Sequence, residues 1–190
     1  MNVYAIKEAD RMTRKILVFS DSHNNNEYMN KALETHRDAD MFVHLGDGAC
    51  DLSRSFPEHY EKPLIFIEGN GEYYGFVGSD RRYRPQRYAF TEFEGKKIFM
   101  THGHHYEVKY GLSRLIAAAY EMGADIILFG HTHGPISKYI PAGTTLDYIG
   151  ETNRPLLVFN PGSIGVGPIY SFGLLSFNGG EVLPSHGTFR

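Results

Sequence analysis

The chain has only one cysteine and no long uninterrupted apolar run. With Cys50 alone, no disulfide can form within the chain, which favours a reducing compartment and makes the cytoplasm the expected location. No segment reaches the roughly 18 consecutive apolar residues that a membrane-spanning helix requires. Residues 1–14 mix charged side chains instead of forming the apolar core of a signal peptide. We therefore expect a soluble, unprocessed cytoplasmic protein.

The chain also lacks a large excess of either charge, because 19 Lys and Arg residues nearly balance 22 Asp and Glu residues, for a net charge of −3. Such a balance creates no global field towards nucleic acid or an anionic membrane, so any attraction to phosphate has to be local. A length of 190 residues suits one domain, which would bury roughly 70% of its unfolded surface. We assign residues 12–190 to a single domain and residues 1–11 to an N-terminal extension.

Five short apolar runs predict buried strands; the first is followed by a polar loop and the other four by polar side chains with glycines. The runs are residues 16–19, 41–45, 64–67, 97–100 and 126–129. Apolar side chains at helical spacing predict helices over residues 26–36 and 112–120. After Gly134 the pattern changes to shorter strands, with a hairpin through residues 178–180. Alternating strands and helices predict an α/β layered fold, in which ligands bind beyond the carboxyl ends of the strands.

Potential metal ligands follow these predicted strands. Asp21 and His23 are two residues apart after the first strand, so an extended backbone would let them share one ion. Asp47 and Asn70 each lie beside glycines after the next two strands. Taken singly, these residues have an ordinary alternative role in turns and helix caps.

Histidines strengthen the metal interpretation. Gly130-His131-Thr132-His133-Gly134 would place two imidazoles on one exposed turn, which favours a metal over a satisfied surface pair. His102 and His104 follow the neighbouring strand. Turn chemistry does not predict so many imidazoles at strand ends. A site with carboxylates, an amide and imidazoles but no thiolate suits Mn²⁺, Fe²⁺, Zn²⁺ or Ni²⁺ better than Ca²⁺ or Mg²⁺ alone.

In this order the residues resemble the calcineurin-like metallophosphoesterase superfamily, and within it the small bacterial and archaeal phosphodiesterase branch that is related to the retromer subunit. The matching blocks are Asp21-Ser22-His23, Gly46-Asp47, Gly69-Asn70, Thr101-His102-Gly103-His104, Gly130-His131-Thr132-His133 and Asn160-Pro161-Gly162-Ser163. The resemblance covers the chain from about Lys15 to its end. It implies a four-layer α/β/β/α fold, in which a sandwich of two sheets is flanked by helices.

The resemblance also implies two divalent metal ions, Mn²⁺ first and Fe²⁺, Ni²⁺ or Zn²⁺ as alternatives. The implied ligands are Asp21, His23, Asp47 and His133 for one ion, and Asp47, Asn70, His102 and His131 for the other. Asp47 would bridge ions about 3.5 to 4 Å apart, which lower the pKa of a shared water so that hydroxide attacks phosphorus in line. The implied activity is hydrolysis of a small phosphodiester, with Asp47 and Asn70 as catalytic residues.

One block departs from the family pattern. Many members follow Gly-Asn with His-Glu, where the histidine helps to protonate the leaving group, and the small branch often has Cys-Asp. This chain has Gly71-Glu72. His104 is then the nearest imidazole candidate for the general acid, and we expect a preference for substrates with good leaving groups.

Several features keep alternatives open. The Arg- and Tyr-rich residues 73–88 form either a clamp for phosphate or a nucleobase, or a solvated loop or edge strand. We interpret Cys50 as a small buried apolar residue. The competing functions are a scaffold with little catalysis and a phosphomonoesterase. The expected partner is a small phosphodiester, without a membrane or a strong nucleic-acid signal, and a homo-oligomer is compatible with the sequence.

Overall fold

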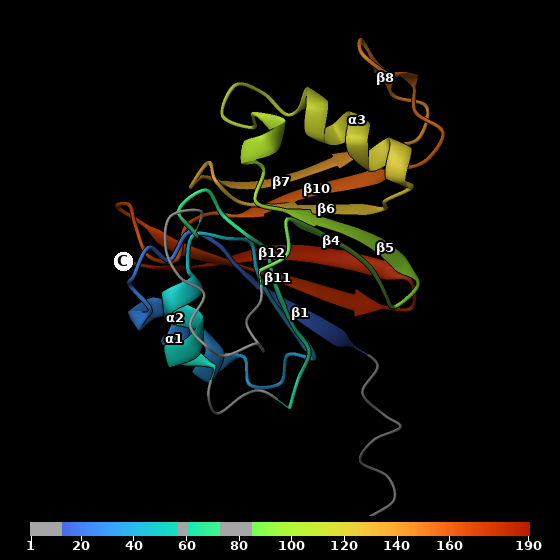
Figure 1. Ribbon diagram of the computed structural model, residues 1–190. Helices are drawn as coiled ribbons and strands as arrows, with labels where there is room; N and C mark the ends of the chain where they lie inside the picture. The colour runs from blue at the N-terminus through green and yellow to red at the C-terminus, as the bar shows by residue number, and fades with distance from the viewer. Residues whose placement is uncertain (1–12, 57–60, 73–84) are drawn as a thin grey trace, which may run out of the picture.

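The computed structural model describes residues 13–56, 61–72 and 85–190. The predicted extension, residues 1–11, and residues 73–84 of the Arg- and Tyr-rich segment lie outside the described residues. The described chain forms two five-stranded sheets and one two-stranded ribbon. Figure 1 shows the two large sheets stacked on each other, with α3 above the upper sheet and α1 and α2 below the lower one.

The first sheet has the strand order β12-β11-β1-β2-β3. Its strands are β1 (Arg14–Phe19), β2 (Met41–His44), β3 (Leu64–Phe66), β11 (Tyr170–Asn178) and β12 (Glu181–Phe189). β1, β2 and β3 run parallel, whereas β11 and β12 are antiparallel to their neighbours. Helices α1 (Glu27–Thr35) and α2 (Ala49–Ser55) follow β1 and β2 and pack on the outer face of this sheet.

The second sheet has the strand order β4-β5-β6-β10-β7. Its strands are β4 (Tyr88–Phe93), β5 (Lys96–Thr101), β6 (Ile126–Phe129), β7 (Pro135–Ile140) and β10 (Leu156–Pro161). β5, β6 and β10 run parallel, and the two edge strands are antiparallel to them. The remaining elements are the 3-10 helix η3 (His104–Tyr106), helix α3 (Ser113–Met122), and the ribbon of β8 (Thr145–Leu146) and β9 (Gly150–Glu151).

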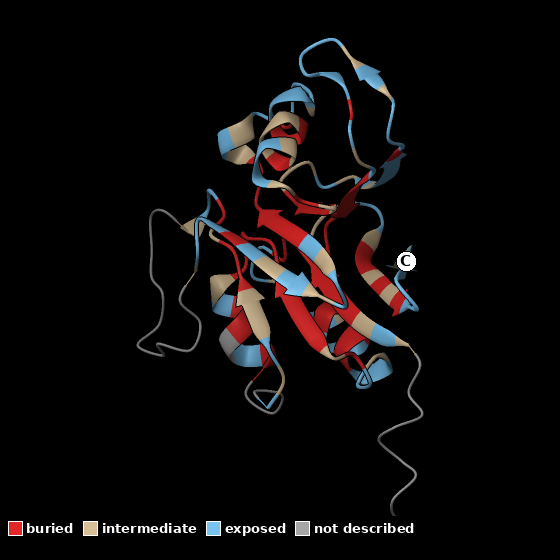
Figure 2. Cartoon of the chain, turned by 90° about the vertical axis from the view of Figure 1, so that its right-hand side faces the viewer, coloured by how far each residue is buried: buried red, intermediate tan, exposed pale blue. Residues whose placement is uncertain are grey.

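Successive side chains of one strand enter different apolar layers. In β1, Ile16 packs between the two sheets, whereas Leu17 packs against α1 and α2. In β6, Leu128 lies between the sheets and Phe129 lies under α3. A strand buried on both faces needs apolar residues at every position, which explains the continuous runs in the sequence. Figure 2 shows these strands as the most buried part of the chain, and the four-layer prediction is confirmed.

Two elements and one residue differ from the sequence-based expectations. β4 was not predicted, because it is an edge strand with only Ala89 buried. α2 was not predicted either, because Leu52 is the only large apolar side chain that this short helix buries, and two further buried side chains, Asp51 and Ser55, are polar. The interpretation of Cys50 as buried is wrong, since Cys50 lies exposed in the first turn of α2.

None of the helices in the described part of the chain has the length and apolarity needed to span a bilayer.

Candidate metal centre

The carboxyl ends of the parallel strands of both sheets meet at one edge of the sandwich. The loop after β1 is joined to the loop after β2, because the N–H groups of Asp21 and His23 donate to the carbonyls of Gly46 and Asp47, each at 2.9 Å. The first sheet is joined to the second where the His131 N–H donates to Asp21 Oδ2 at 3.0 Å. The loops after β1, β2 and β6, which carry five of the predicted ligands, are therefore held together.

Three of the predicted ligands form one group at this edge. The ligating atoms of Asp21, His23 and His133 lie within 4.8 Å of one another. His133 Nε2 is 3.3 Å from Asp21 Oδ1 and 3.3 Å from His23 Nε2. Asp21 Oδ1 is buried, yet it accepts no hydrogen bond of good geometry even from His133. A buried carboxylate oxygen without a donor beside two imidazoles fits a cation.

A second group is centred on His102. The Nδ1 atom of His102 is 2.7 Å from the carbonyl oxygen of Leu45. Because a carbonyl can only accept, Nδ1 carries a proton, and in the neutral form of the ring Nε2 would present a lone pair. This Nε2 lies 3.2 Å from Asn70 Oδ1 and 3.1 Å from His131 Nδ1. Electron pairs from an imidazole and an amide oxygen therefore converge, an arrangement that a cation would stabilise.

Asp47 lies between the two groups. Its Oδ2 atom is 3.8 Å from His23 Nε2 in the first group and 3.6 Å from His102 Nε2 in the second. Its other oxygen, Oδ1, accepts a hydrogen bond from the Gly71 N–H at 2.7 Å. One carboxylate oxygen thus faces both groups, while the other is held by a backbone N–H group.

The backbone is unusual at these residues. Eight non-glycine residues in the described ranges have a positive φ, and five of them are predicted ligands. These five are Asp21 (54°), His23 (47°), Asp47 (59°), His131 (68°) and His133 (58°). The left-handed region costs a non-glycine residue roughly 1–2 kcal/mol, so the surrounding contacts must offset it. Strain of this kind gathers where a function requires it.

Burial and neighbouring side chains shift the pKa values of the predicted ligands. Burial opposes ionisation of Asp21, but contact with His133 and the charge of His102 outweigh it, so the pKa of Asp21 is lowered. Contact with Asp21 in turn raises the pKa of His133. Burial and the neighbouring His102 lower the pKa of His131 to about 4. His131 is therefore neutral near pH 7, which is the form that ligates a metal.

His104, the candidate general acid, lies in η3 beside the His102 group. Its ring centroid is 5.3 Å from that of His102 and 6.1 Å from that of His131. Burial, followed by the charges of His102 and His105, lowers the pKa of His104 to about 4. The structure thus places an imidazole next to the cluster, and its role in proton transfer stays a prediction.

The Asn160 to Ser163 block supports the ligand loops from the second sheet. The side-chain amide of Asn160 donates to the Gly130 carbonyl at 2.9 Å, just before His131. The Ser163 hydroxyl donates to the Asp21 carbonyl at 2.8 Å. Sequence reasoning included this block in the resemblance but gave it no role, and its role is to hold two ligand-bearing loops together.

Glu72 is a residue whose contribution sequence reasoning missed. It was treated only as part of the departure after Asn70, yet its carboxylate accepts hydrogen bonds from the backbone N–H groups of Asp47 at 2.9 Å and Ala49 at 3.1 Å. No sequence pattern links residue 72 to residues 47 and 49, because the contact depends on how the loops after β2 and β3 approach each other.

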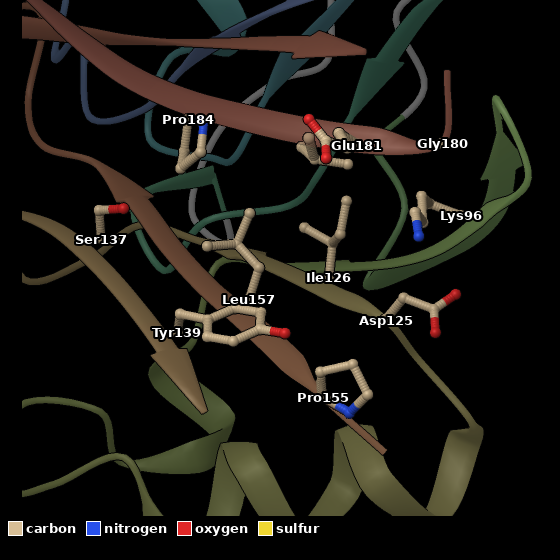
Figure 3. A pocket seen from close by; sticks show the side chains of 11 residues that line it. Lys96, Asp125, Ile126, Ser137, Tyr139, Pro155, Leu157, Gly180, Glu181 and Pro184 are labelled. Atoms are coloured by element: carbon tan, nitrogen blue, oxygen red, sulfur yellow. The ribbon is translucent and has the colours of Figure 1, made fainter. Parts of the chain in front are cut away.

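The described chain also has a cavity of about 570 Å³ away from this cluster. Figure 3 shows the cavity between the start of β12 and the second sheet. Its lining comes from the amino ends of β5, β6 and β10, and includes Lys96, Ile126 and Leu157. None of the seven predicted ligands contributes to it, so it lies at the opposite end of the sandwich from the metal cluster.

Comparison with known proteins gives several matches. A family model described as the calcineurin-like phosphoesterase superfamily domain matches residues 14–179. The chain is 29% identical over 150 residues to "Probable metallophosphoesterase YsnB" of Bacillus subtilis (strain 168), covering 78% of this chain and 74% of that protein.

Two solved structures share the fold. Vacuolar Protein Sorting 29 from Cryptosporidium parvum is similar with a TM-score of 0.66 and 15% identity, covering 94% of this chain and 98% of that one. A structure described as a novel archaeal phosphodiesterase has a TM-score of 0.61 and 21% identity, covering 92% and 99%. At these identities the likeness establishes the architecture and leaves the chemistry to the residues themselves.

Proposed function

The chain belongs to the calcineurin-like phosphoesterase superfamily, a family of metal-dependent hydrolases of phosphoric esters, and from this premise we propose that it hydrolyses small phosphodiesters with two divalent ions. The observation that carries the proposal is the position of Asp47, whose Oδ2 faces His23 on one side and His102 on the other. The archaeal structural neighbour is described as a phosphodiesterase, so a diester is the first substrate to test.

Each ion would have four protein ligands. One ion would be held by Asp21, His23, Asp47 and His133, and the other by Asp47, Asn70, His102 and His131. When bound, paired divalent cations neutralise charge on the phosphate and activate a water for attack on phosphorus. The donor set lacks a thiolate, which favours Mn²⁺, with Fe²⁺, Ni²⁺ and Zn²⁺ as alternatives.

The protein itself fixes the direction of these donors. The Leu45 carbonyl holds the ring of His102 so that Nε2 faces the cluster, as outer hydrogen bonds commonly do for metal-binding histidines. The Gly71 N–H holds one oxygen of Asp47 and leaves the other directed at both imidazole groups. Asn70 turns its amide oxygen towards His102, which leaves its amide N–H groups to donate to a phosphate oxygen.

The Mn²⁺-loaded protein should cleave bis(p-nitrophenyl) phosphate and should lose that activity in excess chelator. Asp47→Asn removes the shared negative charge, and His131→Ala removes one imidazole of the second group, so each should lower kcat/KM by at least 100-fold. His36→Ala, at the end of α1 and away from the cluster, is the matched control and should keep full activity. Activity that survives chelation and both substitutions would contradict the proposal.

We also propose that His104 is the proton donor to the leaving group, because it is the imidazole next to the His102 ring and residue 71 has no side chain. Because its pKa is lowered to about 4, His104 is protonated in only a small fraction of molecules near pH 7 and is a weak donor there. His104→Ala should then slow dialkyl phosphodiesters, in which an alkoxide has to leave, more than bis(p-nitrophenyl) phosphate. The wild-type enzyme should itself prefer good leaving groups. Similar rates for both substrate types, with no selective effect of His104→Ala, would exclude this role.

A scaffold function is the alternative that the fold allows, since a Vacuolar Protein Sorting 29 protein has the same architecture. The complete set of predicted ligands in this chain favours the enzyme. A metal-replete protein that is inert towards both bis(p-nitrophenyl) phosphate and p-nitrophenyl phosphate would favour the scaffold. Faster turnover of the monoester than of the diester would instead indicate a phosphomonoesterase.

A further inference from the structure

The carboxylate of Glu72 lies between the two loops that carry Asp47 and Asn70. Its Oε2 atom accepts hydrogen bonds from the N–H groups of Asp47, at 2.9 Å, and of Gly69. Its Oε1 atom accepts from the N–H groups of Ala49, at 3.1 Å, and of Gly48. Four backbone donors from two separate loops therefore meet on one side chain.

Among the residues that the structure describes, these donors have no other hydrogen-bond acceptor. Gly48 and Ala49 lie at the start of α2, where a helix leaves its first N–H groups unpaired, and Gly48 offers no side-chain cap. A carboxylate that accepts several N–H groups makes charge-assisted bonds, which are stronger than neutral ones. Both oxygens of Glu72 are occupied in this way, so Glu72 is oriented as a structural acceptor and not as a metal ligand.

The loops around Glu72 are packed too closely to accept a side chain at Gly69. A Cβ atom on Gly69 would lie 2.1 Å from Asp47 Oδ1 and 2.6 Å from Glu72 Oε2. Two residues after Gly69, the Gly71 N–H donates a hydrogen bond to Asp47 Oδ1 at 2.7 Å. Glu72 thus fixes the main chain of Asp47 while its neighbour Gly71 fixes the side chain.

We infer that Glu72 is a positioning residue that locks the Asp47 loop to the Asn70 loop and so sets the geometry of the shared carboxylate. Without the carboxylate, the four N–H groups would lose their common acceptor, and the two loops would separate. In Glu72→Gln one oxygen would still accept, but the NH2 group would face two N–H donors. The inference rests on the proposed function for its effect on turnover, but its effect on metal binding is independent of catalysis.

The test compares Glu72→Gln and Glu72→Asp with the control Glu92→Gln, which changes an exposed carboxylate on β4. Titration calorimetry with Mn²⁺ should show an affinity loss of about 10- to 100-fold for Glu72→Gln, the range typical of residues that orient metal ligands. Glu72→Asp keeps the charge on a shorter side chain and should recover part of the affinity. Glu92→Gln should bind Mn²⁺ as the wild type does.

Kinetics with bis(p-nitrophenyl) phosphate at saturating Mn²⁺ should show a lowered kcat and a nearly unchanged KM for Glu72→Gln, because the substrate does not touch Glu72. Wild-type Mn²⁺ affinity in a folded Glu72→Gln variant would overturn the inference. If Glu72→Gln does not fold, wild-type affinity in Glu72→Asp together with rapid amide exchange at Gly48 and Gly69 of the wild-type protein would overturn it. Wild-type protein that binds Mn²⁺ but hydrolyses nothing would refute the proposed function alone.

Discussion

Lowering the pH should destabilise the protein through a histidine beneath the metal cluster. His44, the last residue of β2, is fully buried, and its Nδ1 accepts a hydrogen bond from the Gly46 N–H at 3.3 Å. Burial lowers the pKa of His44 to about 4; Asp21 and Asp47 raise it, His102 and His23 lower it, and burial prevails. The imidazole is therefore neutral in the folded protein above about pH 4.

The sign and size of the effect follow from the two pKa values. An unfolded histidine titrates near 6.5, so between pH 6.5 and about 4 the unfolded chain binds a proton that the folded chain does not. The contribution of His44 to stability is full above pH 6.5 and is lost as the pH falls towards 4. The full loss corresponds to about 3 kcal/mol, of which about 2 kcal/mol is lost between pH 7 and pH 5.

Urea unfolding followed by circular dichroism, in chelator at pH 7 and pH 5, measures this loss. His44→Gln cannot titrate, so its free energy of unfolding should fall by about 2 kcal/mol less than that of the wild type over this interval. His36→Gln is the control, because burial lowers the pKa of His36 too but the ring is only partly buried. Equal pH dependence in the wild type and in His44→Gln would refute the reasoning.

Three further predictions concern packing and loop geometry. Phe159→Ala empties a site between the sheets that has no exposed surface and should lower the free energy of unfolding by about 3–5 kcal/mol in urea. Gly130→Ala would place a Cβ atom 1.9 Å from Ser20 Oγ, so it should displace the loop of His131 and weaken Mn²⁺ binding in calorimetry. Arg154→Ala removes a bond to the Tyr120 carbonyl and a cation–π contact with its ring, and should lower the thermal midpoint by several degrees, a loss of about 1–2 kcal/mol.

The apolar runs predicted the central strands well because those strands are buried on both faces. The run over residues 126–129 coincides with β6, and the run over residues 41–45 ends one residue beyond β2. β4 was missed because an edge strand has one exposed face and needs no continuous apolar run. Periodicity also does not show that the strands divide between two sheets; the family resemblance supplied that part of the fold.

The candidate site could also be predicted only in part. The order of the blocks identified which side chains should gather, since the carboxyl ends of parallel strands share an edge. The position of Asp47 between two groups of imidazoles came only from the family resemblance, because that arrangement depends on the loop conformation and on a positive φ at Asp47. The role of Glu72 was hidden for a similar reason: its partners are four backbone N–H groups, and no side-chain pattern marks them.

Electron paramagnetic resonance of the protein loaded with two equivalents of Mn²⁺ tests most directly whether Asp47 joins two metal ions. Ions that share one carboxylate lie about 3.5–4 Å apart, so the wild-type protein should give the spectrum of a spin-coupled Mn²⁺ pair. Asp47→Asn should lose that coupling, whereas His36→Ala should keep it. A wild-type spectrum of isolated Mn²⁺ ions, or binding of a single ion per chain, would contradict the two-metal centre.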